Sequence, residues 1–204
     1  ARPWELFSLH ALLAAVMLVW GLLGYARSED AAERLGRRLA VAFHFAARRP
    51  AAEVGFGIAA GFAIWGGVLL LLLAIGAAIL ALGGEGILPS GPPGAITFLV
   101  AQPAWLRLAA ALSAGLVEEA FFRGFLQPRI GIAFSTALFV LAHWSYGQPF
   151  MLVGVTLLSV VYGLLARWRG NVWAAAAAHA VFDAVQLLVV VPWAVEQIGA
   201  GGGL

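Results

Sequence analysis

The stretch SAGLVEEAFFRGF, residues 113–125, is the most informative part of the sequence, because it places two adjacent carboxylates, Glu118 and Glu119, in an otherwise apolar run. Arg123 follows about one helical turn later. Charged side chains at the middle of a bilayer cost about 2.5–3.5 kcal/mol each on insertion scales. Such a stretch is therefore expected in the interior of a membrane helix bundle, with its charged groups turned away from lipid.

The composition of the whole chain agrees with a membrane protein. Of 204 residues, 63% are hydrophobic and 11% are charged, whereas soluble domains are about half apolar and a quarter charged. The chain has no cysteine, which excludes disulfides, zinc–thiolate sites and cysteine nucleophiles. A formal net charge of +2 gives no reason to expect nucleic-acid binding, so the expected surroundings are the lipid bilayer.

Long apolar runs predict the membrane spans, since about 20 residues of helix cross the hydrocarbon core. Six runs qualify, at residues 4–25, 54–82, 104–126, 131–146, 150–168 and 172–193. The first run lacks a basic region and a small-residue cleavage site, so we expect a retained helix rather than a signal peptide.

Two further segments flank the early spans. Residues 27–53 are charged and amphipathic and predict a loop or an interfacial helix. Residues 95–103 are apolar but short, and predict a re-entrant or interfacial piece that ends at Pro103. The expected fold class is therefore all-α, a polytopic membrane bundle of about six transmembrane helices that forms a single integral membrane domain, 1–204.

The arginines predict the orientation of this bundle, since cytoplasmic loops carry an excess of basic residues. All 12 basic residues are arginines; six lie in the loop 27–53 and two at the end of each of the third and fifth spans. Arg2 and Arg107 lie on the opposite side. We expect the arginine-rich loops in the cytoplasm. Exclusive use of arginine, with heavy Ala and Gly usage, indicates a bacterial source and hence a bacterial inner membrane.

The first polar site is the glutamate pair. Glu119 and Arg123 are four residues apart with the acid first, so they share a helix face and are expected to form a structural ion pair. Glu118 points about 100° away from Glu119 on an α-helix. We therefore expect Glu118 to be left without an arginine partner and to be available as a general base.

Two histidine motifs form the other polar sites. FVLAH ends at His143 on the fourth span, and HAVFD places His179 and Asp183 on one face of the sixth span. Asp183 can orient the imidazole or bind beside it, although structural pairing alone remains the alternative. At a rise of 1.5 Å per residue, these groups lie at depths similar to that of Glu118, which predicts that all line one cavity.

Other features are interpreted as packing elements. His10 lies in the first span, where no acid is expected beside it, and His44 lies in the charged loop; both are expected to be packing or interfacial residues. Gly57 and Gly61 form a G-x-x-x-G pattern that is typical of a helix-packing face. The alanine run 174–178 is expected to permit close helix approach beside the second histidine motif.

The three motifs resemble those of the CPBP family, which contains the type II CAAX prenyl endopeptidases and bacterial proteins called bacteriocin-processing or self-immunity proteins. The family pattern is E-E-x-x-x-R, then F-x-x-x-H, then H-x-x-x-N or H-x-x-x-D. EEAFFR, FVLAH and HAVFD match it in order and on separate spans. The resemblance covers the last four spans and implies a catalytic core at about 104–194.

The resemblance implies an intramembrane endopeptidase in which Glu118 and His143 activate a water while His179 and Asp183 stabilise the oxyanion. It implies structural support of the site from Glu119, Arg123 and Phe139. Prenyl proteases often have Asn where this chain has Asp183. An ionised Asp cannot donate to an oxyanion, so Asp183 is protonated, holds His179, or helps to bind a metal; the favoured interpretation is that it holds His179.

Metal use is the first open alternative. Glu118, His143 and His179 could form a zinc site of two histidines and one carboxylate. No H-E-x-x-H helix is present, so a glutamate-type mechanism without a cofactor is favoured.

The second open alternative concerns the function itself. The expected substrate is a hydrophobic peptide or a membrane-anchored protein, as in removal of a C-terminal sorting anchor or in peptide processing. The competing hypothesis is a non-proteolytic membrane protein, either a proton-coupled carrier or a self-immunity scaffold, that uses the same Glu/His cluster. Carriers often contain inverted repeats, and the sequence has no evident internal repeat.

Overall fold

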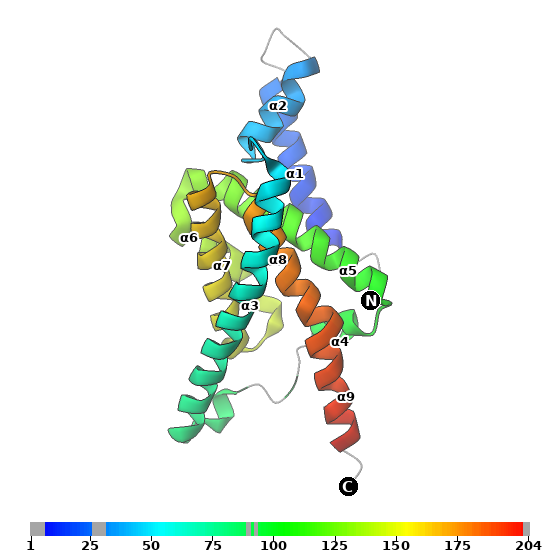
Figure 1. Cartoon of the computed structure of the whole chain (residues 1–204), viewed down its shortest axis with the longest axis vertical. Coiled ribbons are helices and arrows are strands. Elements are labelled where there is room, and N and C mark those ends of the chain that lie inside the picture. The colour runs from blue at the N-terminus through cyan, green and yellow to red at the C-terminus, as the bar shows by residue number, and fades with distance from the viewer. Residues whose placement is uncertain (1–6, 26–31, 89–90, 92–93, 202–204) are drawn as a thin grey trace.

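A computed structural model of the chain describes residues 7–25, 32–88, 91 and 94–201. These residues form a bundle of helices without strands, which confirms the all-α prediction (Figure 1). The elements are α1 (Ser8–Tyr25), α2 (Ala32–Ala42), α3 (Pro50–Ala81), η2 (Glu85–Ile87), α4 (Gly94–Val100), α5 (Ala104–Ser113), η3 (Ala114–Glu118), η4 (Ala120–Leu126), α6 (Gln127–Ala142), η5 (Trp144–Tyr146), α7 (Pro149–Arg169), α8 (Trp173–Val185), η6 (Gln186–Val190) and α9 (Val191–Gly201).

Within these ranges, four helical stretches are long and apolar enough to cross a membrane, and Ser8–Leu23 is a shorter apolar helix. The four stretches are Pro50–Ala81, Ala104–Tyr146, Pro149–Arg169 and Trp173–Gln197. The second of them contains both the third and the fourth predicted spans. Its backbone breaks at Gly131, with φ 81° and ψ 167°. Ser135 Oγ donates to the carbonyl of Phe122 at 2.7 Å, so the two arms on either side of the break pack against each other.

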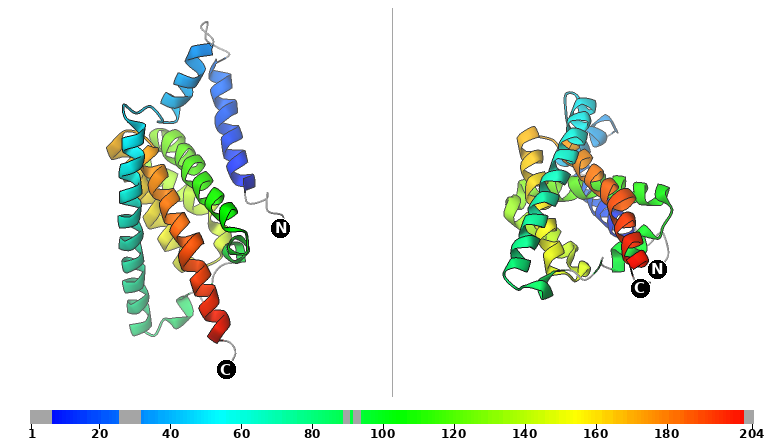
Figure 2. Two further views of the ribbon diagram at one scale, coloured as in Figure 1. Left: turned by 45° about the vertical axis from the view of Figure 1, so that its right-hand side comes forward. Right: turned by 60° about the horizontal axis from the view of Figure 1, so that its bottom comes forward.

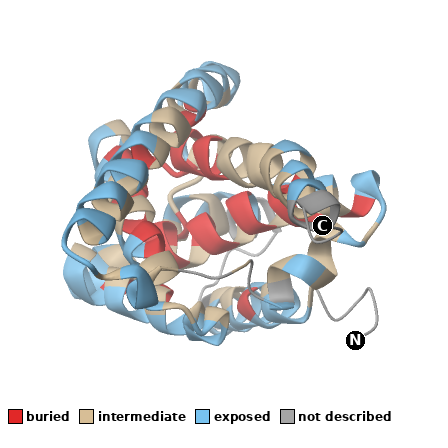
Figure 3. Cartoon of the chain, turned by 90° about the horizontal axis from the view of Figure 1, so that it is seen from below, coloured by how far each residue is buried: buried red, intermediate tan, exposed pale blue. Residues whose placement is uncertain are grey.

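The helices are apolar on both their inner and outer faces, as a bundle in lipid requires. Buried residues lie on the inward faces of the helices, whereas the outward faces are exposed (Figure 3). The exposed residues include large hydrophobic side chains, among them Leu70, Leu73, Phe134, Leu141 and Leu164. Exposed leucine and phenylalanine on this scale indicate surfaces that face acyl chains.

Helices α3 and α8 pack closely through the small residues singled out in the sequence. A Cβ atom at Gly57 would collide with the carbonyl oxygen of Ala174. One at Gly61 would lie 2.8 Å from the Cβ of Val181 and 2.9 Å from the carbonyl oxygen of Ala178. The predicted packing face and the role of the alanine run are therefore confirmed.

The charged segment 27–53 is partly helical, as the interfacial prediction allowed. Its helix α2 ends at Ala42, and α3 begins at Pro50 rather than at residue 54, because proline is well suited to the first turn of a helix. Glu53 therefore lies in this first turn, where its carboxylate forms two hydrogen bonds of 2.8 Å with Arg169 at the end of α7. Arg2, Arg27 and the beginning of the first predicted span lie outside the described residues.

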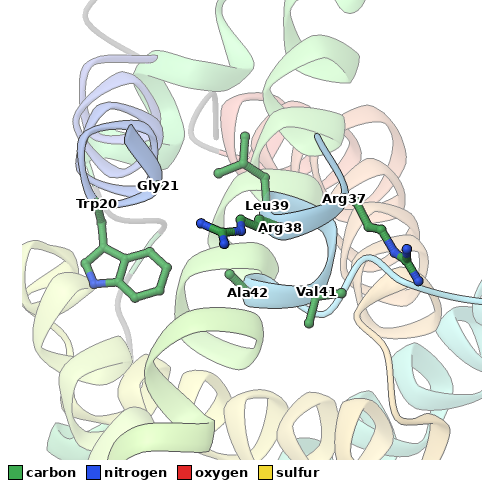
Figure 4. Close-up of a pocket in the computed structure, with 7 residues that line it drawn as sticks. All are labelled: Trp20, Gly21, Arg37, Arg38, Leu39, Val41 and Ala42. Carbon is green, nitrogen blue, oxygen red and sulfur yellow. The ribbon is translucent and has the colours of Figure 1, made fainter. Parts of the chain in front are cut away.

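Helix α1 lies to one side of the bundle, with α2 beside its upper end (Figure 2). It contacts η3 and η4, and the ring of Trp20 lies 5.2 Å from that of Phe125. A cavity of about 540 Å³ opens between α1 and α2 and is lined by seven residues (Figure 4): Trp20, Gly21, Arg37, Arg38, Leu39, Val41 and Ala42. No carboxylate or histidine is among these lining residues, so the polar motifs belong to a different part of the molecule.

Candidate active site

The two glutamates lie where the helix widens into π-helical turns, with Glu118 at the end of η3 and Glu119 directly before η4. Such turns occur frequently at functional sites. Gly115 allows η3 to approach α8 closely, because a Cβ there would lie 2.5 Å from the carbonyl oxygen of Ala176 and 2.8 Å from the Cβ of Ala180. This close approach brings the glutamates against the histidine motif of α8.

Glu119 is the centre of a buried polar cluster, although its Oε2 has no hydrogen-bond partner in the described part of the chain. Its side chain is fully buried, and its Oε1 lies 2.9 Å from Arg123 Nη1 and 2.8 Å from His179 Nδ1. The Arg123 guanidinium also donates from Nη2 to the carbonyl of Ser159 at 3.2 Å, and its central carbon lies 4.3 Å from the ring centroid of Phe139. The predicted ion pair is confirmed, and it has a third member, His179, that the sequence did not indicate.

Glu118 faces a different environment. Its residue is 5% exposed, and its Oε1 lies 3.1 Å from His10 Nε2. The other oxygen, Oε2, is buried and has no hydrogen-bond partner in the described part of the chain. The prediction that Arg123 does not also serve Glu118 agrees with this geometry. The expectation that no acid lies near His10 is wrong, because the fold brings together residues 108 positions apart.

The ring nitrogens of His143 have distinct roles. Its Nδ1 lies 2.8 Å from the carbonyl oxygen of Phe139, one turn earlier. A carbonyl oxygen can only accept, so Nδ1 carries the hydrogen, and in the neutral ring Nε2 retains its lone pair. The edge of the Tyr146 ring packs against the imidazole, with 5.3 Å between ring centroids. His143 Nε2 is therefore a hydrogen-bond acceptor that is held in a fixed direction.

His179 lies between two carboxylates. Its Nδ1 is 2.8 Å from Glu119 Oε1, whereas its Nε2 is 3.5 Å from Asp183 Oδ2. The short carboxylate contact is thus with Glu119, although the i,i+4 spacing had favoured Asp183 as the residue that holds this imidazole. The side chain of Asp183 is 29% exposed, so it lies on the more accessible side of the ring.

One cavity of about 650 Å³ connects these groups. Its lining includes the four residues proposed from the motifs, namely Glu118, His143, His179 and Asp183. Much of the remaining lining is apolar, with contributions from Leu72, Ile96, Leu99, Phe150 and Val190. The predicted convergence of groups from three separate spans on one cavity is confirmed.

Several side chains at this site had no signal in the sequence. His10 and Tyr146 also line the cavity. Tyr162 is 1% exposed, and its ring stacks on the imidazole of His179 at 5.1 Å between centroids and an angle of 19°. Its hydroxyl is buried without a partner among the described residues. These residues come from α1, η5 and α7, so only packing relates them to the motifs.

The geometry does not fit the zinc alternative. In the part of the chain that the structure describes, no three His, Asp or Glu side chains are arranged so that they could hold a metal ion. No metal-dependent step is derived from this site.

A cavity in a helical membrane bundle, lined by two carboxylates and three histidines, defines a membrane protein whose ionisable groups gather at one candidate site. Residues 100–185 match the family described as type II CAAX prenyl endopeptidase Rce1-like. All three motifs fall within this match, which confirms the resemblance indicated by their order and spacing.

A curated relative and the solved structures complete the comparison. The uncharacterized protein YpbD of Bacillus subtilis (strain 168) is 38% identical over 69 residues, which cover 33% of this chain and 36% of the relative. The similarity thus spans about a third of that relative's length. No solved structure matches the chain significantly. Helices α1 to α3 and most of α4 lie outside the family match.

Proposed function

We propose that this protein is an intramembrane endopeptidase that uses Glu118 as its general base. One observation carries the proposal: Glu118 Oε2 is buried, has no partner in the described part of the chain, and belongs to the same cavity as His143. A buried carboxylate oxygen without a protein partner is expensive to maintain. A role in binding and deprotonating a water explains its retention, and the family match supports this reaction class.

In the proposed reaction, a water bound between Glu118 Oε2 and His143 Nε2 attacks the carbonyl carbon of the scissile amide. Its proton passes to Glu118 as the C–O bond forms, and the carbonyl oxygen becomes an oxyanion. Glu118 then returns the proton to the amide nitrogen as the C–N bond breaks. Positioned general acid–base groups of this kind contribute about 10²–10⁴-fold to rate.

His179 is the proposed oxyanion donor. Because its Nδ1 donates to Glu119, an N–H on Nε2 requires the doubly protonated ring, and a ring between two carboxylates is suited to that state. Asp183, on the Nε2 side, balances this charge. Preorganised donors at a developing oxyanion are usually the largest single contribution to such a reaction.

The proposed substrate is a hydrophobic peptide or the membrane-anchored segment of a protein. A largely apolar cavity of about 650 Å³ that includes Phe150 and Leu99 suits an extended apolar chain entering from the bilayer. Removal of a C-terminal sorting anchor and peptide processing both fit this description.

We further propose a bacterial inner-membrane location with the arginine-rich segments in the cytoplasm, and a single domain over 1–204 with its catalytic core at 104–194.

The proposal is tested by mass spectrometry of the termini of membrane proteins from cells that express either the wild-type chain or Glu118→Gln. New C-termini within or next to hydrophobic segments are expected with the wild type and not with the variant. Glu85→Gln, which changes an exposed glutamate in a short turn, is the matched control and should behave as the wild type. Identical termini in all three samples would refute the proposed activity.

A further inference from the structure

We propose that His10 of α1 is a positioning residue for the base Glu118, so that the active site is completed by a helix outside the segment that matches the family. This inference rests on the proposed function, because it assigns His10 a role toward the same base. The family match begins at residue 100, and His10 belongs to none of the three motifs.

Two short contacts define the position of His10. Its Nε2 lies 3.1 Å from Glu118 Oε1, and its Nδ1 lies 2.8 Å from the hydroxyl oxygen of Ser113. The His10 side chain is 11% exposed and that of Glu118 is 7% exposed. Both ring nitrogens are thus engaged inside the protein, and both partners lie on the helix that carries the glutamate pair.

The chemistry of the partners gives these contacts a direction. An ionised carboxylate can only accept, so His10 Nε2 carries the hydrogen and donates it to Glu118. In the neutral ring Nδ1 is then an acceptor, and the Ser113 hydroxyl donates to it. The three residues form a chain of donors from hydroxyl to imidazole to carboxylate, and such a chain stabilises the ionised form of Glu118 that a base requires.

The same contact selects which carboxylate oxygen is left for chemistry. His10 occupies Oε1, and Oε2 remains without a protein partner in the described residues. A carboxylate held at one oxygen has a restricted side-chain rotation, so Oε2 keeps a constant direction. Hydrogen-bonded supporting groups orient reactive side chains in the same way at metal sites.

Helix α1 is held independently of His10, which allows the two roles to be separated. Leu13 is 7% exposed and packs in one cluster with Phe122 and Phe139. Trp20 adds a ring contact with Phe125 farther along the helix. An apolar residue at position 10 would therefore suffice to dock α1, whereas a histidine inside a membrane helix is costly unless it is used.

The test compares His10→Asn, His10→Gln and Leu13→Ala in steady-state cleavage of a peptide identified by the terminal mass spectrometry described above. In His10→Gln, the side-chain amide nitrogen can occupy the position of His10 Nε2 and donate to Glu118. In His10→Asn, the shorter side chain places its amide nitrogen only at the position of Nδ1. We expect His10→Asn to lower kcat about tenfold to a hundredfold with little change in KM, the size expected for a lost hydrogen bond to a charged group. His10→Gln should recover most of this loss, and Leu13→Ala should lower kcat by less than about threefold.

A second measurement separates failure of this inference from failure of the proposed function. Unfolding in detergent of His10→Asn, Glu118→Met and the double variant forms a double-mutant cycle, in which residues in contact give non-additive effects. Met has a similar size and cannot accept a hydrogen bond from His10, so each single variant removes the contact. If Glu118→Gln abolishes cleavage while His10→Asn cleaves as the wild type does, the positioning role is wrong and the proposed function stands. If the cycle is additive, the contact itself is absent. If Glu118→Gln cleaves normally, the proposed function fails and the positioning role fails with it, whatever coupling the cycle reports.

Discussion

Glu118 and Glu119 are neighbours in the chain, yet they lie in opposite kinds of environment. Glu119 is fully buried and closed in by Arg123 and His179, at 2.9 and 2.8 Å. Among the described residues, Glu118 has one hydrogen-bond contact, with His10, and its second oxygen has none. Each carboxylate thus keeps one oxygen without a partner among the described residues. Glu119, however, is paired with Arg123 and lies away from the cavity lining, whereas Glu118 has no arginine partner and lines the cavity.

Under the proposed function, the difference explains how a membrane protein keeps a reactive carboxylate in place. Ionic groups in a low-dielectric interior must be paired, or their burial is strongly unfavourable. The Glu119 cluster meets this requirement, and it also orients His179 beside the cavity. The adjacent Glu118 is thereby fixed on a rigid helix while it remains available for chemistry. The following predictions test this division of roles.

The largest expected effect is the loss of catalytic rate in the Glu118→Gln variant. An amide cannot take up the proton of a water, so kcat should fall by about 10²–10⁴-fold, the usual contribution of a general base. The free energy of unfolding in detergent should change little, because Gln retains the shape and can still accept from His10. Cleavage at the wild-type rate would contradict the assignment of Glu118 as the base.

Arg123→Ala is expected to act mainly through stability. It leaves Glu119 charged and buried without its arginine, which costs about 3–5 kcal/mol for a broken buried pair. Unfolding monitored by circular dichroism in detergent measures this loss, and Arg167→Ala, an exposed arginine on α7, is the control with a change of less than about 0.5 kcal/mol. An Arg123→Ala protein that is as stable as the wild type but inactive would place the Glu119 cluster in the chemistry.

Asp183→Asn should have an intermediate effect. Because Glu119 still holds His179 Nδ1, the imidazole remains oriented, and only the charge beside Nε2 is lost. We expect kcat to fall by about tenfold, the equivalent of one charge-assisted hydrogen bond, with stability unchanged. Full activity of Asp183→Asn would indicate that the side chain at this position donates to the oxyanion directly, as an amide does.

The smallest effect is expected for Tyr162→Phe. The hydroxyl has no partner among the described residues, so its removal should change the free energy of unfolding by less than about 0.5 kcal/mol and leave kcat unchanged. The ring contact with His179 remains in this variant. A large loss of kcat in Tyr162→Phe would show that this hydroxyl, and not only the Glu118 side, takes part in the reaction.

Features that depend on local geometry were predicted well from the sequence. The ion pair between Glu119 and Arg123 is set by a spacing of four residues, and it persists although the helix widens into π turns. The positions of the apolar spans follow from hydropathy, since each backbone polar group must be satisfied within the helix in lipid. The Gly57 and Gly61 face was recognisable because close packing of membrane helices requires small residues.

The partners of the histidines could not be predicted. The i,i+4 rule favoured Asp183 for His179, but the shorter contact comes from Glu119, 60 residues away. His10 had no acid within reach along its own helix, and its partner lies 108 residues away. Which of several carboxylates approaches an imidazole depends on how far one helix is rotated and shifted against another, and a single sequence carries no direct record of that.

From the sequence alone it was possible to predict that this chain is an α-helical membrane bundle, which spans carry its ionisable groups, and which family its motifs resemble. Those properties follow from hydropathy, from helical periodicity and from the cost of charge in lipid. Three other features depend on how the helices pack: Glu119 contacts His179, His10 of α1 contacts Glu118, and it is Glu118, with its unpartnered Oε2, that lines the cavity. The physical reason is that hydrogen bonds require distances near 3 Å and defined directions, and between separate helices these are set by side-chain packing.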